Sequence, residues 1–479
     1  MDTARRTKIV ATLGPATDEP GVIVGMVAAG LNVARINFSH GTRDSQRKRI
    51  DMVRAAARDA DRYVGILADL AGPKIRIESF VGGAVQLVEN APFALDTTLD
   101  PAGGNINEVG CAYQNLPADV RAGDTLLLAD GQIVLDVDKV VGSRIHCVVK
   151  VGGELSNRKG LNRQGGGISA PALTDKDLED IRLAAELGID YLAVSFARDG
   201  DDMRRAQSEL RKWRGEALVV AKIERHEALD NLAGILAVTD VVMVARGDLG
   251  VEMGYAELTG LQKTIIAQSL ARNRVVITAT QMMESMIQNP MPTRAEVSDV
   301  ANAVLDGTDA VMLSAETAAG KYPVKAVQAM ADVIRGAEKY QLGAQRGVLR
   351  AEDEFGSSEE AISRAVMYTA NHMRVRAIVA LTESGSTPLW MSRIRADIPI
   401  YAFTRHEGTR RRVTLYRGVY AVPFDITHTE SRELYQSIFD RLLSLGLVDV
   451  NDLVILTKGE QSGVSGGTNS MQIVRVTQR

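Results

Sequence analysis

The sequence predicts an α/β fold built on a (β/α)8 TIM barrel, with an inserted all-β lid domain and a C-terminal domain that contains an open α/β sheet. Three observations lead to this prediction. Eight short apolar runs alternate with helical patterns, as expected of parallel strands that are covered on both faces. A long segment rich in glycine and strand signals interrupts the third unit, and a second alternation of strands and helices follows near residue 340.

The eight barrel strands are expected at runs rich in Val, Ile and Ala, each bounded by helical patterns. These runs lie near residues 8–14, 33–39, 64–70, 191–197, 218–224, 241–248, 275–281 and 310–317. Eight repeated strand–helix units indicate a closed barrel. In that fold, the side chains that perform chemistry lie at the carboxyl ends of the strands.

The third unit is interrupted, because no convincing helix begins between its strand and the segment LTDKDLEDIRLAAELG, where Thr174 and Asp177 resemble a capping box. Within the insert, Asp130-Gly131 of LLLADGQIVLDV predicts a tight hairpin turn. The insert leaves from the carboxyl end of a strand, so we expect it over the mouth of the barrel as a moving lid. The triple glycine at residues 165–167 is either a hinge of this lid or a loose loop.

The polar stretch that begins near residue 340 reads as a linker to a third domain. Its strands are expected at residues 377–383, 399–404, 419–424, 452–458 and 471–476. The predicted domains are the barrel at 1–70 and 169–339, the lid at 71–168 and the C-terminal α/β domain at 340–479.

The composition excludes several classes of partner. The 56 basic and 60 acidic side chains give a formal net charge of -4, which predicts no binding to nucleic acid or to an anionic membrane. The two cysteines, Cys111 and Cys147, fit a reducing compartment, and no apolar run reaches membrane length, so we expect a cytoplasmic protein. The arginine cluster TRRRVTLYRG at 409–418 is expected to be a solvated or subunit-facing surface rather than a ligand site.

Polar groups gather at the predicted carboxyl ends of the barrel strands. In VVAKIER, Lys222 and Glu224 share one face of an otherwise apolar strand, so they form either a structural ion pair or part of a site. Other strand ends carry Arg35, Asn37, Ser39, Asp69, Ser195, Arg198, Gly247, Asp248, Thr280, Ser314 and Glu316. A structural ion pair alone would not predict charged groups at the same end of several strands, which favours a site.

The residue types indicate phosphate chemistry. Glu224 and Asp248, at the ends of neighbouring strands, could hold one hard divalent ion together with substrate oxygens. Lys222 supplies a compact charge for a developing negative one, while Arg35 and Arg76 offer planar forks suited to phosphate oxygens. Backbone N–H groups in the ARGDLG segment could bind a small carboxylate. Together these groups suit a phosphorylated small acid.

Several motifs resemble those of the pyruvate kinase family. They are VARINFSHG, ADLAGPKIR, AKIER, VARGDLGVE and the long run from Ile277 to Pro323, and the match spans nearly the whole chain. The resemblance implies phosphoryl transfer from phosphoenolpyruvate to ADP, giving pyruvate and ATP, as the last step of glycolysis. It also implies Mg²⁺ or Mn²⁺ as cofactor, an allosteric phosphorylated small-molecule effector and a homotetramer.

The resemblance implies roles for the residues at the strand ends. Lys222 matches the lysine that stabilises the phosphoryl transition state and the enolate, and Thr280 matches a residue near the enolate carbon that must be protonated. Glu224 and Asp248 match the Mg²⁺ ligands. The catalytic and substrate-binding positions are Arg35, Lys222, Gly247, Asp248 and Thr280.

Three further groups of residues follow from the same resemblance. The nucleotide-binding positions are Asn37, His40, Arg76 and Lys159. The monovalent-cation positions are Asn37, Ser39, Asp69 and Leu70, the last through its backbone. The loop LTESGSTP resembles an effector phosphate cradle, although it also reads as an ordinary helix cap, and its residues are Thr382, Ser384, Gly385, Ser386 and Thr387.

The chain departs from the family pattern beside the monovalent-cation positions. Where many members read DTKGPEIR it reads DLAGPKIR, so that Lys74 replaces a glutamate. Relatives with lysine at this position generally need no potassium, so we expect K⁺ to be dispensable even if its pocket is kept. The late loop KGEQSGVSGGTNS offers only Lys458 as a basic group for a second effector phosphate.

Two other functions would account for part of this pattern. A barrel lyase or aldolase that acts on pyruvate or phosphoenolpyruvate with Mg²⁺ would use Glu224 and Asp248 but would not need a nucleotide lid. A nonenzymatic metabolite sensor would not need Lys222, Glu224, Asp248 and Thr280 together.

Overall fold

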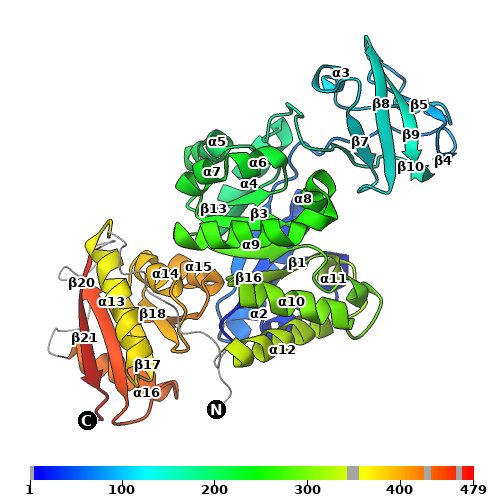
Figure 1. Ribbon diagram of the computed structural model, residues 1–479. Helices are drawn as coiled ribbons and strands as arrows, with labels where there is room; N and C mark the ends of the chain where they lie inside the picture. The colour runs from blue at the N-terminus through cyan, green and yellow to red at the C-terminus, as the bar shows by residue number, and fades with distance from the viewer. Residues whose placement is uncertain (1–4, 342–354, 426–432, 460–466, 479) are drawn as a thin grey trace.

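A computed structural model describes residues 5–341, 355–425, 433–459 and 467–478. Figure 1 shows three parts: a central barrel, a lid at one end of it and a C-terminal sheet domain on the other side. The predicted fold class is confirmed, because all eight predicted runs form one closed parallel barrel with the strand order β1-β16-β15-β14-β13-β12-β3-β2. None of the helices in the described ranges is long and apolar enough to cross a membrane.

The barrel strands are short and consist mostly of apolar residues. They are β1 (Lys8–Leu13), β2 (Val33–Asn37), β3 (Gly65–Asp69), β12 (Tyr191–Val194), β13 (Leu218–Ile223), β14 (Val241–Ala245), β15 (Val275–Ala279) and β16 (Ala310–Leu313). β3 pairs directly with β12, with Leu67 opposite Tyr191, although the whole lid lies between them in the sequence. The ring therefore closes across the insertion point.

Helices cover the outside of the barrel and bury the outward-facing strand residues. The larger ones are α1 (Val22–Ala29), α2 (Arg43–Asp59), α4 (Asp175–Glu186), α5 (Gly200–Lys212), α7 (Leu232–Val238), α8 (Arg246–Met253), α9 (Tyr255–Ala271), α10 (Arg294–Asp306) and α12 (Pro323–Gln341). The shorter ones are α6 (His226–Asp230), α11 (Ala315–Ala318) and the 3-10 turns η1 (Pro15–Thr17) and η2 (Glu284–Ile287). The predicted capping box of α4 is confirmed, since the backbone N–H of Asp177 donates to Thr174 Oγ1 and the Thr174 N–H donates back to the Asp177 carboxylate.

The insert is a mainly antiparallel β structure with one short helix, in which only β5 and β6 pair in parallel among the named strands. Its strands are β4 (Ala84–Leu87), β5 (Pro92–Asp96), β6 (Glu108–Gly110), β7 (Thr125–Leu128), β8 (Ile133–Val141), β9 (Arg144–Val151), β10 (Gly153–Ser156) and β11 (Leu161–Arg163), and the helix is α3 (Leu116–Asp119). Six of these strands form one sheet in the order β11-β7-β8-β9-β5-β6, and β10 pairs with β4. The predicted hairpin joins β7 to β8, with Asp130 and Gly131 at φ 56° and 88°. Both cysteines are free and buried in the lid core.

The triple glycine is not a loose loop. All three residues have positive φ values, between 75° and 93°, which favour glycine. The N–H of Gly167 donates to Glu227 of the barrel at 2.6 Å, and the N–H of Gly165 donates to the carbonyl oxygen of Glu252 at 3.2 Å. The barrel thus holds the returning lid segment at fixed points, while movement about it stays a prediction.

The C-terminal domain contains the predicted open sheet in the order β19-β18-β17-β20-β21, in which only β21 is antiparallel to its neighbour. Its strands are β17 (Ala377–Leu381), β18 (Ile400–Thr404), β19 (Val419–Pro423), β20 (Leu453–Gly459) and β21 (Thr468–Arg475). Its helices are α13 (Ser358–His372), α14 (Ser386–Ser392), α15 (Glu407–Arg412), α16 (Leu434–Ser444) and the 3-10 turn η3 (Val413–Leu415).

The clusters of buried apolar side chains show which of the three parts are packed against each other. Barrel residues such as Val10 and Met243 belong to the same apolar cluster as Leu415 and Val419 of the C-terminal domain. The lid has a cluster of its own, which includes Leu95, Leu135 and Ile145. The barrel and the C-terminal domain are therefore packed together, whereas the lid packs around its own core.

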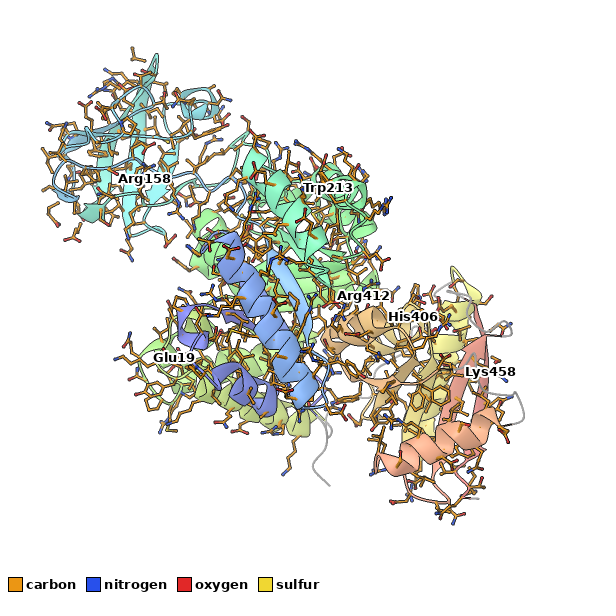
Figure 2. All side chains as sticks on the ribbon, turned by 180° about the vertical axis from the view of Figure 1, so that it is seen from behind. Glu19, Arg158, Trp213, His406, Arg412 and Lys458 are labelled. Carbon is orange, nitrogen blue, oxygen red and sulfur yellow. The ribbon has the colours of Figure 1, made fainter. Side chains whose placement is uncertain are left out.

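The arginines of α15 contact the barrel at the amino-terminal ends of its strands, which corrects the expectation of a solvated or subunit-facing surface. Arg411 Nε lies 3.0 Å from Asp190 Oδ1, and Arg412 reaches Glu216 at 3.4 Å. Figure 2 labels Arg412 where the barrel and the C-terminal domain meet. The sequence could not reveal this, because the acidic partners lie about two hundred residues earlier in the chain.

Candidate active site

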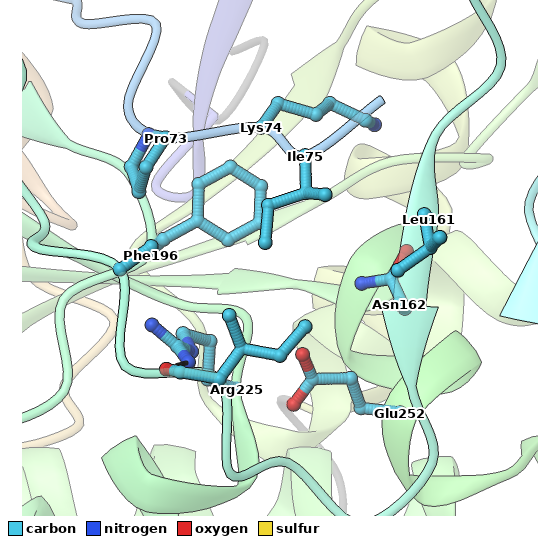
Figure 3. A pocket seen from close by; sticks show the side chains of 10 residues that line it. Pro73, Lys74, Ile75, Leu161, Asn162, Phe196, Arg225 and Glu252 are labelled. Carbon is cyan, nitrogen blue, oxygen red and sulfur yellow. Dashed lines mark hydrogen bonds between the residues drawn. The ribbon is translucent and has the colours of Figure 1, made fainter. Parts of the chain in front are cut away.

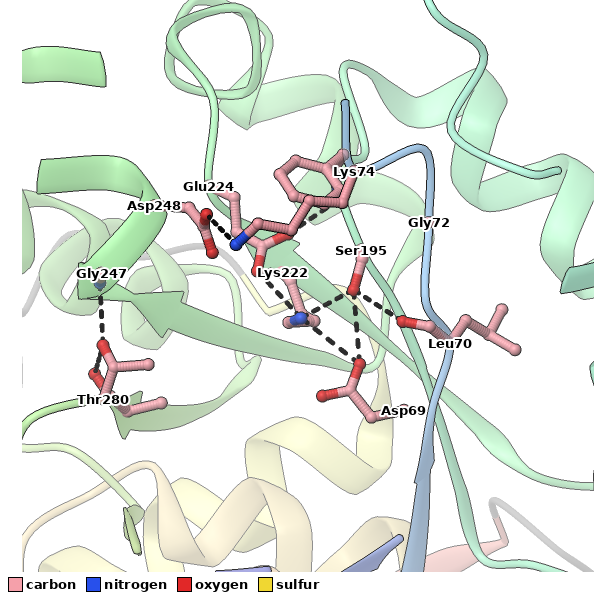
Figure 4. A network of polar contacts seen from close by, with 12 residues as sticks. Asp69, Leu70, Gly72, Lys74, Ser195, Lys222, Glu224, Gly247, Asp248 and Thr280 are labelled. Carbon is pink, nitrogen blue, oxygen red and sulfur yellow. Dashed lines mark hydrogen bonds and ion pairs between the residues drawn. The ribbon is translucent and has the colours of Figure 1, made fainter. Parts of the chain in front are cut away.

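The predicted strand-end residues converge on a buried lysine. Lys222, near the end of β13, donates from Nζ to Ser195 Oγ at 2.6 Å and lies 2.8 Å from Glu224 Oε1 and 3.3 Å from Asp69 Oδ1 (Figure 4). Asp69 ends β3, and its other oxygen accepts from Arg35 Nε at 2.7 Å. The rim therefore carries a connected set of charges rather than one isolated ion pair.

The two carboxylates keep Lys222 protonated. Burial alone would lower the pKa of Lys222, but Asp69 and Glu224 outweigh it, so that the pKa is raised above its usual value. Burial would likewise raise the pKa of Asp69, but the charges of Lys222 and Arg35 lower it overall. A buried positive charge is thus held in place at the mouth of the barrel.

Glu224 and Asp248 form the candidate site for a divalent cation. Burial raises the pKa of Glu224, Lys222 opposes this rise, and the nearby charge of Asp248 adds to it. Glu224 Oε2 accepts from the backbone N–H of Phe196 at 2.8 Å, and Asp248 Oδ1 lies 3.2 Å from Lys74 Nζ. Two carboxylates on adjacent strand ends fit a Mg²⁺ ion that keeps waters and substrate oxygens as its other ligands.

The donor set is limited to these two carboxylates. Within the described ranges, the chain has no group of three or more His, Cys, Asp or Glu side chains that could hold a metal ion. An all-protein metal cage is therefore absent from this part of the chain. A cation bound here would take its remaining ligands from water or from the substrate.

Thr280 and Gly247 lie together where the neighbouring strands β15 and β14 end. The N–H of Gly247 donates to Thr280 Oγ1 at 2.8 Å, and this hydroxyl donates to the Ala279 carbonyl oxygen at 2.6 Å. The Gly247 N–H predicted to bind a carboxylate is thus bonded to the threonine. Thr280 has φ 68°, a left-handed conformation that is strained for a threonine.

Arg246 holds this strained segment, and sequence reasoning missed it. Its guanidinium donates to the Thr280 carbonyl oxygen at 2.8 Å and forms two 2.7 Å bonds to the carboxylate of Asp299. Its position directly after β14 and next to Gly247 could have marked Arg246 as a candidate. Its partner on α10 could not be identified from spacing. Ser195 was noted at a strand end, but its bond to Lys222 was not foreseen.

The predicted monovalent-cation residues lie near Asp69. Asn37 Oδ1 accepts from the N–H of Ser39 at 3.0 Å, and the Leu70 carbonyl oxygen accepts from Ser195 Oγ at 2.8 Å. Asp69 is already paired with Arg35 and Lys222. Lys74 places its ammonium on Asp248 and not on this group.

The predicted nucleotide-binding residues are divided between two parts of the molecule. Asn37 ends β2 and His40 follows it on the barrel, with His40 exposed. Arg76 and Lys159 are exposed on the lid, on segments joined by the bridge between Arg76 and Gly160. The structure groups them as two pairs, and lid closure would have to bring the pairs together.

The predicted effector loop follows β17. Gly385 donates its N–H to Thr382 Oγ1 at 2.9 Å, while the hydroxyls of Ser386 and Thr387 both donate to Glu359 Oε1 at 2.7 Å. Ser384 Oγ donates to Ser386 Oγ at 3.1 Å. A buried carboxylate, which sequence reasoning did not identify, therefore faces these hydroxyls. Residues 460–466 of the late loop lie outside the described residues.

The closed (β/α)8 barrel, the buried cationic side chains at its rim and the two carboxylates suited to a divalent cation fit an enzyme of the phosphoryl-transfer class. The family description "Pyruvate kinase, barrel domain" matches residues 4–327, and "Pyruvate kinase, alpha/beta domain" matches residues 360–474. The chain belongs to the pyruvate kinase family and is a phosphotransferase.

Individual relatives are similar over their full length. The chain is 51% identical to pyruvate kinase II of Salmonella typhimurium, covering 98% of this chain and 99% of the relative. It is 49% identical to a pyruvate kinase of Haemophilus influenzae, covering 95% and 96%. A solved pyruvate kinase from Cryptosporidium parvum has a TM-score of 0.91 at 32% identity, covering 99% of this chain and 96% of that one.

Proposed function

We propose that this chain transfers the phosphoryl group of phosphoenolpyruvate to ADP at the barrel rim, giving pyruvate and ATP. The observation that carries the proposal is the buried, protonated Lys222 beside Asp69, Glu224 and Ser195. A fixed, buried charge stabilises the negative charge that develops as the phosphorus–oxygen bond to the enol breaks.

The other rim residues take complementary roles. Arg35 orients the transferring phosphoryl group through its guanidinium fork, and the new bond forms to a terminal oxygen of ADP. The enolate left behind takes a proton at carbon near Thr280. Gly247 and Asp248 contribute to substrate binding, and Asn37, His40, Arg76 and Lys159 contact the nucleotide phosphates.

Glu224 and Asp248 would hold the divalent cation, for which Mg²⁺ and Mn²⁺ both suit carboxylate oxygens. When bound, such an ion would neutralise charge on the phosphate oxygens. The proposal also includes a homotetramer, a cytoplasmic location and domain bounds of 1–70 with 169–339, 71–168 and 340–479.

A coupled assay for ATP tests the proposed function. Purified chain with phosphoenolpyruvate, ADP and Mg²⁺ should form ATP and pyruvate in equal amounts. Pyruvate formed without ADP would favour the lyase or aldolase, and no product with either mixture would favour the sensor. Either result would contradict the proposal.

Activity is expected to depend little on potassium. Asp69, the carboxylate of the proposed monovalent-cation group, is already paired with Arg35 and Lys222, and Lys74 adds a further positive charge on a long flexible stem. Rates should be compared in potassium and in a bulky tetraalkylammonium salt at equal ionic strength, because screening alone alters the affinity for charged ligands. A large loss without potassium would contradict this prediction, whereas Lys74→Glu should create the dependence.

A sugar monophosphate or a nucleotide monophosphate should activate more readily than a sugar bisphosphate. The hydroxyls of the proposed effector loop can bind one phosphate. Glu359 adds a negative charge beside them, which disfavours a second phosphate group. Lys458, the basic group considered for a second phosphate, lies over the ring of Tyr435. Titrating both classes of compound against the initial rate, with Glu359→Gln as the comparison, tests this. A strong preference of the natural chain for the bisphosphate would show that it is wrong.

A further inference from the structure

We infer that Lys74 competes with the divalent cation for Asp248, so that cation binding releases the base of the lid. This inference rests on the proposed function, because it takes Glu224 and Asp248 as the cation ligands. It assigns to Lys74 a positioning role that is separate from any effect on potassium.

The contact joins two parts of the molecule. Lys74 lies on the segment that leads from β3 into the lid, and Asp248 lies in the first turn of α8 on the barrel. Their Nζ and Oδ1 atoms are 3.2 Å apart (Figure 4). The two side chains are 34% and 23% exposed, so water and ions can reach the pair. It is therefore a reversible contact between the lid and the barrel.

The charges of the rim explain why the two cations would compete. Lys222 is paired with Glu224 and Asp69, and Arg35 is paired with Asp69. The side chains of these pairs are at most 12% exposed, whereas the Lys74 side chain is 34% exposed. A divalent cation on Glu224 and Asp248 would add two positive charges close to the Lys74 ammonium, and like charges at such short range repel strongly.

Lys74 can change partner because its side chain is 34% exposed. It lines a cavity of about 30 Å³ at the lid root, together with Ile75, Phe196, Arg225 and Glu252 (Figure 3). A cavity of this size has room for about one water molecule. The long stem of a lysine can therefore change direction without repacking the barrel core.

Competition at Asp248 gives an order to the events at the rim. The cation takes the carboxylate first, and the lid base is then free to move over the substrates. The released ammonium becomes available to other anions at the rim, including phosphate oxygens.

Equilibrium binding of Mn²⁺ to the full chain, without phosphoenolpyruvate or nucleotide, tests the inference directly. Free Mn²⁺ is measured by electron paramagnetic resonance. Lys74→Met should bind Mn²⁺ about three- to tenfold more tightly than the natural chain, the range expected for removing a partly exposed charge pair and its repulsion. Lys74→Arg keeps the charge and should stay close to the natural value.

Lys150→Met is the matched control, because Lys150 is also a lid lysine paired with an aspartate, Asp136, at 3.4 Å. It removes the same charge elsewhere on the lid and should leave Mn²⁺ affinity unchanged. Unchanged affinity in Lys74→Met, or equal tightening in both variants, would overturn the inference. If Asp248→Asn bound Mn²⁺ as well as the natural chain, the proposed cation site itself would be wrong.

Discussion

Replacing Lys222 with Met is expected to lower kcat about a hundredfold or more while phosphoenolpyruvate binding stays measurable. The ammonium is held by Asp69, Glu224 and Ser195, so it is already oriented before charge develops on the reacting oxygen. Its effect is therefore greatest in the transition state, and its loss should reduce kcat more than substrate affinity. Steady-state rates and equilibrium dialysis with phosphoenolpyruvate measure the two quantities.

The control must remove a buried lysine without touching the rim. Lys8 begins β1 at the opposite end of the barrel, and its Nζ donates to the Val419 carbonyl oxygen at 2.6 Å. Lys8→Met should keep its turnover, and circular dichroism checks that both variants are folded. A near-normal kcat in Lys222→Met would show that Lys222 does not stabilise the transition state.

Replacing Asp309 with Ala is expected to lower the free energy of unfolding by roughly 3–5 kcal/mol. Asp309 precedes β16 and is only 1% exposed, and it pairs with Arg393 of the C-terminal domain, which is 3% exposed. Its Oδ2 atom also accepts from the N–H of Val276 at 2.9 Å. The substitution would leave a buried guanidinium and a backbone donor without this partner.

Denaturant titration followed by circular dichroism measures the loss of stability. The matched control is Asp332→Ala, because Asp332 pairs with Arg335 one helical turn away on the exposed face of α12. Loss of such an exposed pair costs less than about 1 kcal/mol. Equal unfolding midpoints for the two variants would show that the buried pair does not join the barrel to the C-terminal domain.

The barrel could be predicted because each strand is buried on both faces and so reads as an apolar run, for example VVMVA in β14. A charge within such a run is conspicuous, which is how Lys222 and Glu224 were found. The capping box of α4 was also readable, because its two residues are three positions apart.

Pairings between distant segments could not be predicted. Arg246 bonds to Asp299, Arg411 to Asp190 and Ser386 to Glu359, and no local pattern connects the members of these pairs. Lys74 was identified from the family pattern, but its contact with Asp248 depends on where the lid stands over the barrel. Such contacts depend on the tertiary structure and not on local propensity.

The direct pairing of β3 with β12 makes the lid a removable module. The ring of strands is complete without it, and the apolar cluster of the lid is its own. A short loop in its place would leave every strand pairing of the barrel intact. Mutation can therefore alter the length and the charge of the lid without remodelling the barrel that holds Lys222.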